Sequence, residues 1–260
     1  MHRWLTLVQF NVRHFTYKQW LCAIAAFCLS TFFTILYYGG HAVSLLDAFI
    51  YHFSIFGGAD FIIVIHTLLP FLILAFFVDL YTENNLNDNL LYTLLRVTKI
   101  NLWASSHLAV LFAMHVVFLG LYYAIAWVVL PLFYEHGAVT VLYWTETASL
   151  DHFYPVPFVL LFSLLIQVSG AFGLSLWQLY VNALSQRVGY GYLSVVLIYL
   201  LAFIFPLKNV WIGSHVTLEK YGVLAAGSGE YSVAIFFAVH TVWIVLFISL
   251  LCRLFWQRKF

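Results

Sequence analysis

The chain has 260 residues, of which 64% are hydrophobic and only 8% are charged. A water-exposed globule of this length needs far more polar surface, so a soluble domain is excluded. Lys and Arg number 11 against 10 Asp and Glu, and no basic block exceeds residues 257–259. The charge balance therefore gives no sign of nucleic-acid binding. We expect an integral membrane protein that forms a single domain over residues 1–260.

The first element is predicted at residues 1–19, ahead of any membrane-length segment. Its apolar residues recur mostly three and four apart, with polar residues elsewhere around the helix: Trp4, Leu5, Val8, Val12 and Phe15. This pattern predicts an amphipathic helix that lies in the membrane interface. The alternative is a basic leader that only sets the topology.

Apolar segments then follow that are long enough to cross a bilayer, which takes about 20 residues at about 1.5 Å per residue. We predict an all-α protein with six transmembrane helices, at residues 20–38, 61–81, 108–133, 158–184, 192–207 and 232–255. The fifth segment is the shortest. The first lacks a small-residue cleavage site after it, so it is expected to be retained. Cys22, Cys28 and Cys252 lie in these segments, which argues against structural disulfides.

Basic residues are distributed unevenly about the predicted spans. Nine lie on one side: Arg3, Arg13, Lys18, Arg96, Lys99, Arg187, Arg253, Arg258 and Lys259. Lys208 and Lys220 lie on the other side. This bias places both termini in the cytoplasm. The segment 208–231 before the last span is then an outer loop, and whether it re-enters the membrane is left open.

Ionisable residues within the spans are candidates for chemistry, because they are costly in a bilayer. His66, His115 and His240 could ligate haem in a redox subunit, but no span carries two suitably spaced histidines. Hydrogen-bonded neutral histidines are the alternative. Asp60 and Asp79 bracket the second span almost a membrane apart, so we expect interface anchoring or a local ion pair for each.

Catalytic and metal-binding motifs are missing from the sequence. It contains neither H-E-x-x-H nor G-x-S-x-G, and no Cys/His ligand cluster. We therefore predict no catalytic residue and no metal site, and the chain is not expected to be an enzyme.

Two sets of residues within the spans suggest helix contacts or a path. Gly170, Ala171 and Gly173 would let another helix approach closely, either as a pore or dimer contact or as packing within the chain. The aromatic residues Tyr122, Trp127 and Trp177 lie in mid-span, where interfacial anchoring does not explain them. They could line a path for an amphiphile or fill the core.

The polar segment 82–107 is the most informative part of the chain. Its second half, NLLYTLLRVTKINLWASSH, carries Arg96, Lys99 and Trp103 just ahead of the third span. This pattern, with the predicted N-terminal helix and six spans, resembles the membrane subunit of an ABC exporter of the type-2 permease superfamily. In that family the corresponding connection is a cytoplasmic coupling helix that docks on the ATPase. The alternative for the basic residues is simple snorkelling to the interface.

The resemblance implies the rest of the functional assignment. Leu91, Leu94, Leu95 and Trp103 would anchor the segment in the membrane surface or a partner groove, and Arg96 and Lys99 would present charge to the ATPase. The chain has no G-x-x-x-x-G-K-[ST] loop, so ATP and Mg would be bound by a separate P-loop ATPase subunit. A second permease half, identical or paired, is implied too.

The resemblance further implies export of an amphiphilic substrate, such as an antimicrobial peptide or a lipid-like molecule, or immunity to one. The protein would be multi-pass in a cell membrane, with a bacterial plasma membrane expected, in contact with lipids. A haem-binding subunit and an ATP-independent transporter or scaffold are the other hypotheses.

Overall fold

The computed structural model describes residues 2–12, 17–39, 44–53, 61–84, 100–135, 155–204, 213–216 and 233–258. All regular structure within these ranges is helical. The α-helices are α1 (His2–Val12), α2 (Tyr17–Tyr38), α3 (Leu45–His52), α4 (Phe61–Thr82), α6 (Ile100–Val129), α7 (Val156–Ser185), α8 (Tyr190–Ile204) and α9 (Val233–Arg258). Short 3-10 turns occur at η2 (Leu130–Leu132) and η5 (Ser214–Val216).

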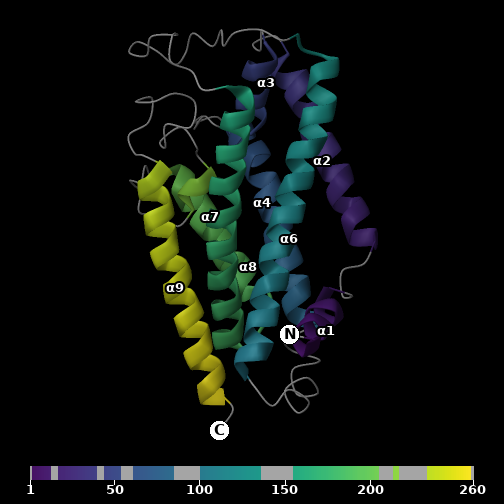
Figure 1. Ribbon diagram of the computed structural model, residues 1–260. Helices are drawn as coiled ribbons and strands as arrows, with labels where there is room; N and C mark the ends of the chain where they lie inside the picture. The colour runs from purple at the N-terminus through teal and green to yellow at the C-terminus, as the bar shows by residue number, and fades with distance from the viewer. Residues whose placement is uncertain are drawn as a thin grey trace.

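The described helices include 5 that are long and apolar enough to cross a membrane, namely α2, α4, α6, α7 and α9. They stand side by side along one direction, and both termini lie at the same end of the bundle (Figure 1). The fifth predicted span corresponds to α8, a helix of 15 residues. A helix of that length covers only about 22 Å at about 1.5 Å per residue, so the sixth crossing stays a prediction.

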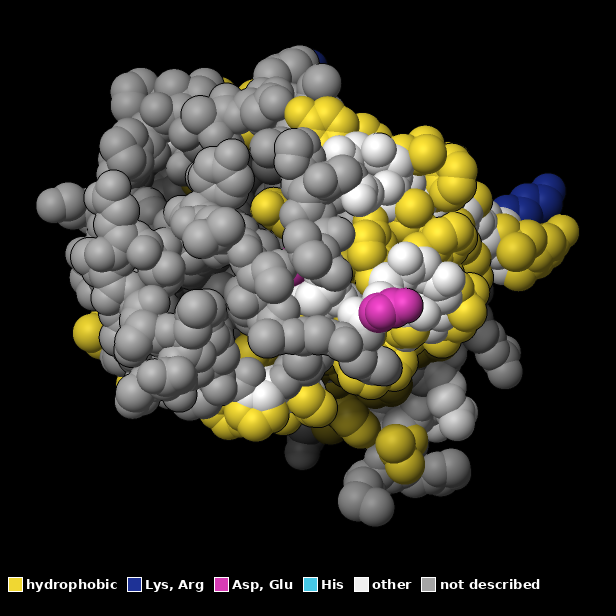
Figure 2. Space-filling model, turned by 90° about the horizontal axis from the view of Figure 1, so that it is seen from above, with side chains coloured by type: hydrophobic (Ala, Val, Ile, Leu, Met, Phe, Trp, Pro, Cys, Tyr) yellow, Lys and Arg dark blue, Asp and Glu magenta, His cyan; other side chains and the backbone are white. Residues whose placement is uncertain are grey.

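The surface of the bundle suits a lipid environment. Large apolar side chains are exposed along the outward faces of α2 and α9, with Leu29 68% and Val242 67% exposed. Figure 2, seen from above, shows apolar side chains over much of the described surface and little charge. The described part of the chain therefore has the form of a multi-pass membrane protein.

Aromatic side chains form the contacts between α2, α4 and α6. The Phe27 and Phe118 rings meet edge to face with centroids 4.8 Å apart, and Phe77 approaches Phe118 in the same way at 5.4 Å. Edge-to-face pairs of this kind contribute about 0.5–1.5 kcal/mol beyond the burial of their area. Part of the high aromatic content is thus explained by core packing.

The N-terminal helix α1 lies at the end of the bundle beside the start of α6 (Figure 1). Asn11 is 1% exposed, and its side-chain amide donates to the Ser106 hydroxyl at 3.4 Å. Leu5, Phe10 and Val12 remain exposed elsewhere around α1. A helix is thus present within the predicted segment 1–19, but it ends at Val12, and residues 17–19 belong to α2. Its position in a membrane interface stays a prediction, with which the exposed apolar residues agree.

The polar segment between α4 and α6 is shorter than the predicted segment 82–107. The helix α4 continues to Thr82, and α6 begins at Ile100, eight residues before the predicted span. The last eight residues of the predicted coupling segment are therefore the first two turns of a membrane helix. The connection between the two helices consists of residues 83–99.

The short helix α3 was not predicted from the sequence. The Ser44 hydroxyl accepts a hydrogen bond from the Asp47 amide at 3.2 Å, and the Asp47 carboxylate accepts one from the Ser44 amide at 3.1 Å. This capping box satisfies backbone donors at the start of the helix. Residues of α3 are buried against the bundle end opposite the termini, among them Phe49 and Ile50, both 0% exposed.

Part of the loop before α9 enters the bundle. His215 in η5 is 0% exposed and packs on Gly170 in α7, 14 residues after the first residue of that helix. At about 1.5 Å per residue this contact lies about 21 Å along α7. The His215 ring also contacts Phe71, with centroids 5.3 Å apart, and its Nε2 hydrogen-bonds the Tyr199 hydroxyl at 3.2 Å. Residues 213–216 thus lie inside the helical bundle.

Candidate functional site where α4 ends and α6 begins

Five of the six predicted ATPase-docking residues lie outside the described residues: Leu91, Leu94, Leu95, Arg96 and Lys99. The sixth, Trp103, lies in the first turn of α6 and is 1% exposed. Its indole is therefore packed within the chain, and it forms the centre of the candidate site described next.

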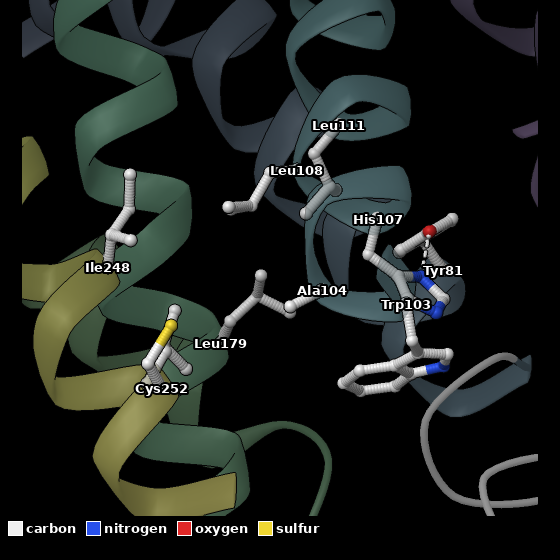
Figure 3. Close-up of a pocket in the computed structure, with 10 residues that line it drawn as sticks. Tyr81, Trp103, Ala104, His107, Leu108, Leu111, Leu179, Ile248 and Cys252 are labelled. Carbon is white, nitrogen blue, oxygen red and sulfur yellow. Dashed lines mark hydrogen bonds between the residues drawn. The ribbon is translucent and has the colours of Figure 1, made fainter. Parts of the chain in front are cut away.

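A cluster of three aromatic side chains joins the end of α4 to the start of α6. The Tyr81 hydroxyl and the His107 Nδ1 share a short hydrogen bond, drawn as a dashed line in Figure 3. Trp103 lies four residues before His107 on α6, and the two rings meet edge to face with centroids 4.5 Å apart. Tyr81 is 2% exposed. These contacts link the two helices at the points where the connecting segment leaves them.

An apolar cavity of about 40 Å³ adjoins this cluster. Its walls come from α4, α6, α7 and α9, and Figure 3 shows Leu108 of α6 facing Ile248 and Cys252 of α9 across it. Apolar groups that border an empty space lack part of their dispersion contacts. The space between α6 and α9 is thus incompletely filled beside Trp103.

The predicted small residues of α7 pack within the chain. A Cβ atom added at Gly170 would lie 2.3 Å from the His215 ring, and one at Gly173 would lie 3.4 Å from Ile244. Ala171 is 3% exposed. These positions agree with the alternative of packing within the chain.

The three mid-span aromatic residues contact two different parts of the chain. The Tyr122 hydroxyl donates to the backbone carbonyl of His52 at 3.0 Å. Trp127 is 48% exposed and stacks on Phe49, and the Trp177 indole donates to the Ser194 hydroxyl at 3.1 Å. Tyr122 and Trp127 thus both lie near α3, where Phe49 and Phe53 stack on each other, whereas Trp177 contacts α8.

A polar cluster that the sequence did not reveal joins α2, α3 and α4. The Thr34 hydroxyl hydrogen-bonds His52 Nδ1 at 2.8 Å, and the Ser30 carbonyl and hydroxyl lie 3.1 and 3.0 Å from His66 Nε2. Ser30 and Thr34 share a face of α2, being four residues apart, which was the available signal. Burial, and next the nearby His66, lowers the pKa of His52 well below its usual value.

A pocket of about 300 Å³ lies beside this cluster, between α2 and α4. Its lining includes Ser30 and His66 together with Leu29 and Ile65. Leu29 and Ile65 are 68% and 49% exposed, so the mouth of the pocket is on the outer face of the bundle. An amphiphile in the lipid would meet an apolar mouth with polar groups behind it.

The other two histidines proposed as haem ligands are hydrogen-bonded within the chain. The His115 ring bonds the Leu111 carbonyl and the Ser175 hydroxyl, each at 2.7 Å. His240 Nδ1 bonds the Phe236 carbonyl at 3.0 Å. Over the described ranges, no three His, Cys, Asp or Glu side chains are grouped as metal ligands. The hydrogen bonds agree with the alternative of neutral histidines.

Comparisons of the chain with protein-family models, curated proteins and solved structures found no match.

Proposed function

We propose that the chain is the permease subunit of an ATP-driven exporter, with a separate P-loop ATPase bound at residues 83–99. The observation that carries the proposal is the Tyr81, Trp103 and His107 cluster. The cluster joins the end of α4 to the start of α6, on either side of residues 83–99. This connection is long, polar and basic, and it is predicted to lie on the cytoplasmic side.

The cluster makes this connection suitable for transmitting a movement. Because Tyr81 and Trp103 are buried, the end of α4 and the start of α6 are held by side-chain packing. A displacement of residues 83–99 would move both helices together. The cavity between α6 and α9 gives α6 room to shift, since packed helices slide in small steps.

The apolar walls of the bundle favour an amphiphilic substrate, either a peptide or a lipid-like molecule. The pocket between α2 and α4 offers apolar walls and two polar side chains, Ser30 and His66. Ligand pockets of this composition orient a mostly apolar molecule by few polar contacts. The exposed apolar face of α2, including Leu21 and Leu36, would meet lipid or a second permease half.

Docking is tested by reversing charge on the connection. We expect the chain to co-purify with a P-loop ATPase from its native membrane, and Arg96→Glu with Lys99→Glu to reduce the retained ATPase at least about tenfold, a loss of about 1.4 kcal/mol. The retained ATPase is measured by quantitative mass spectrometry after detergent extraction.

The matched control is Arg187→Glu, an exposed basic residue in the turn between α7 and α8. It lies on the same predicted side of the membrane but on a different connection, so it should leave ATPase recovery unchanged. Equal recovery with all variants, or no ATPase with the natural chain, would sink the proposal.

A further inference from the structure

One face of α7 carries a row of buried polar side chains. Its members are 0–5% exposed and recur at helical spacing: Ser163, Gln167, Ser175, Gln178 and Asn182. Asn182 lies 19 residues after Ser163, which is about 28 Å along the helix at about 1.5 Å per residue. The row is therefore nearly as long as the hydrocarbon layer of a bilayer is thick, about 30 Å.

In the half toward α3 and in the middle of the bundle, the row is hydrogen-bonded to α6. The Tyr123 hydroxyl donates to Gln167 Oε1 at 2.9 Å. About two turns further along α7, the Ser175 hydroxyl and His115 Nε2 are 2.7 Å apart. The contact between α6 and α7 is thus polar at two depths inside the bundle.

Toward the termini, the row is hydrogen-bonded to α4. Asp79 is 7% exposed, and its Oδ1 accepts from the Gln178 and Asn182 side-chain amides at 2.8 and 2.7 Å. Gln178 Nε2 also donates to the Ala75 carbonyl at 2.8 Å. The helix α7 therefore meets α6 and α4 through side-chain hydrogen bonds at three depths along its length.

The contacts within the helices on either side of this row are made by rings. Phe118 of α6 packs edge to face on Phe27 of α2 and Phe77 of α4. Trp177 of α7 meets Phe247 of α9 with ring centroids 5.6 Å apart. In Figure 1, α7 stands beside α9, and α6 lies toward α2. We call α2, α4 and α6 the N-terminal body and α7, α8 and α9 the C-terminal body, with the polar row between them.

Water affects these two kinds of contact differently. Separating ring contacts in water exposes apolar area, which is unfavourable in proportion to that area. The hydrogen bonds of a polar row exchange for hydrogen bonds to water at a small net cost. The row is therefore the place where the bundle opens to water most easily while each body stays packed.

We propose that the two bodies move against each other along this row, and that the opened row is a water-lined passage through the chain. Polar and ionisable groups inside a membrane commonly mark such pathways, and rocking of one group of helices against another is a known transport movement. The inference rests on the proposed permease function, and the polar part of the amphiphilic substrate would pass along the row. Phe112 is 48% exposed and meets Phe172 with ring centroids 5.4 Å apart, so an apolar contact lies on the outer side of the α6–α7 contact.

The passage is tested by the reaction of introduced thiols with a charged, membrane-impermeant methanethiosulfonate, which requires water at the thiol. The three natural cysteines, Cys22, Cys28 and Cys252, are first replaced by alanine. Ser163→Cys and Ser175→Cys then each place one thiol in the row, and the protein is reconstituted in liposomes. Both serines are buried, so a reaction requires the row to open.

The matched control is Ser249→Cys, because Ser249 is exposed on the surface of α9, in its second half. In a bilayer that surface meets lipid, where the reagent is absent and the thiolate does not form. We expect the two thiols in the row to react at least about tenfold faster than the control thiol. A bundle that stays closed predicts slow reaction at all three positions.

A second substitution assigns the water to the row. Gln167→Leu removes the hydrogen-bonding group between Ser163 and Ser175, and we expect it to slow the labelling of Ser175→Cys at least about fivefold, since apolar walls disfavour water. Its thermal unfolding midpoint shows whether the variant remains folded. Unchanged labelling in a folded Gln167→Leu protein would assign the water to another route and overturn the proposal.

Labelling is measured on the chain alone and, where an ATPase co-purifies, on the complex with ATP. Equal, slow labelling of Ser163→Cys, Ser175→Cys and Ser249→Cys in both samples would overturn the passage, and recovery of the ATPase would leave the exporter proposal standing. Fast labelling of the row without a retained ATPase would support the passage and remove the ATPase as its driver. The two proposals thus fail by different outcomes.

Discussion

Gly170 and Gly120 are two glycines in long helices whose surroundings differ. Replacing glycine by alanine inside a helix is favourable by about 1 kcal/mol when space allows. A Cβ atom at Gly120 would meet nothing within 4 Å, whereas one at Gly170 would lie 2.3 Å from the His215 ring. We therefore expect Gly120→Ala to be neutral or stabilising, and Gly170→Ala to destabilise by about 1–3 kcal/mol through overpacking.

Thermal unfolding of both variants in detergent measures the difference. A raised midpoint for Gly170→Ala would mean that His215 moves aside without cost, and would contradict the packing of η5 inside the bundle. Gly120→Ala serves as the matched control for the general effect of removing a helical glycine.

At the residue scale, the sequence identified Asp79 as a costly charge but not its partners. Gln178 and Asn182 are about 100 residues away in the chain, so nothing local in the sequence pairs them with Asp79. They belong to a row of polar residues at helical spacing on one face of α7, and all of these are buried: Ser163, Gln167, Ser175, Gln178 and Asn182. That spacing was the available signal. The partner of a side chain in a bundle depends on how each helix is rotated, which one apolar sequence does not specify.

The helix α3 is the element whose existence depends most on a local interaction. A helix of 8 residues is unstable by itself and needs capping and burial. Ser44→Ala removes the side-chain acceptor of the capping box, and we expect a loss of about 1 kcal/mol. Amide hydrogen exchange over Leu45–His52 should accelerate by about fivefold for that loss.

Ser105→Ala is the control for the capping experiment, because Ser105 is exposed, far from α3 in the chain, and its hydroxyl donates to the nearby Leu102 carbonyl. Its exchange over α3 should match that of the natural chain. Unchanged exchange in Ser44→Ala would show that burial alone maintains the helix.

At the element scale, long apolar runs were sufficient to predict helices but not their ends. The predicted span 61–81 agrees with α4 to one residue, since apolar composition persists to the end of that helix. The start of α6 was placed eight residues late because Ser105, Ser106 and His107 are polar. Ser106 bonds Asn11 and His107 bonds Tyr81, so these polar side chains are satisfied inside the bundle.

For the whole molecule, buried polar groups connect helices at both ends of the bundle. Near the termini, Asp79 joins α4 to α7, and toward α3 the Thr34 hydroxyl joins α2 to His52. Helices in lipid gain little from apolar burial, so interhelical hydrogen bonds and close packing specify their arrangement. Global stability should therefore respond to changes in the protonation of such groups.

For His52, the direction in which folding stability changes with pH can be stated. It lies in α3, outside the long apolar helices, and burial, then the nearby His66, lowers its pKa well below the usual 6.5. Between that lowered pKa and about 6.5, the unfolded chain binds a proton that the folded chain does not. Folding stability should thus fall as the pH drops below about 6.5, by up to about 1.4 kcal/mol per pH unit for this one group, and should be flat above about pH 7.5.

The dependence is measured from unfolding midpoints between about pH 8 and about pH 5, across the range in which histidine titrates. His52→Gln removes the titrating group and should make the midpoint less sensitive to acid than in the natural chain. A steeper loss on acidification in the variant, or an equal one, would contradict the assignment. The expected loss of stability in acid follows from the burial of His52. Its contacts with the Thr34 hydroxyl and the surrounding rings accommodate a neutral imidazole.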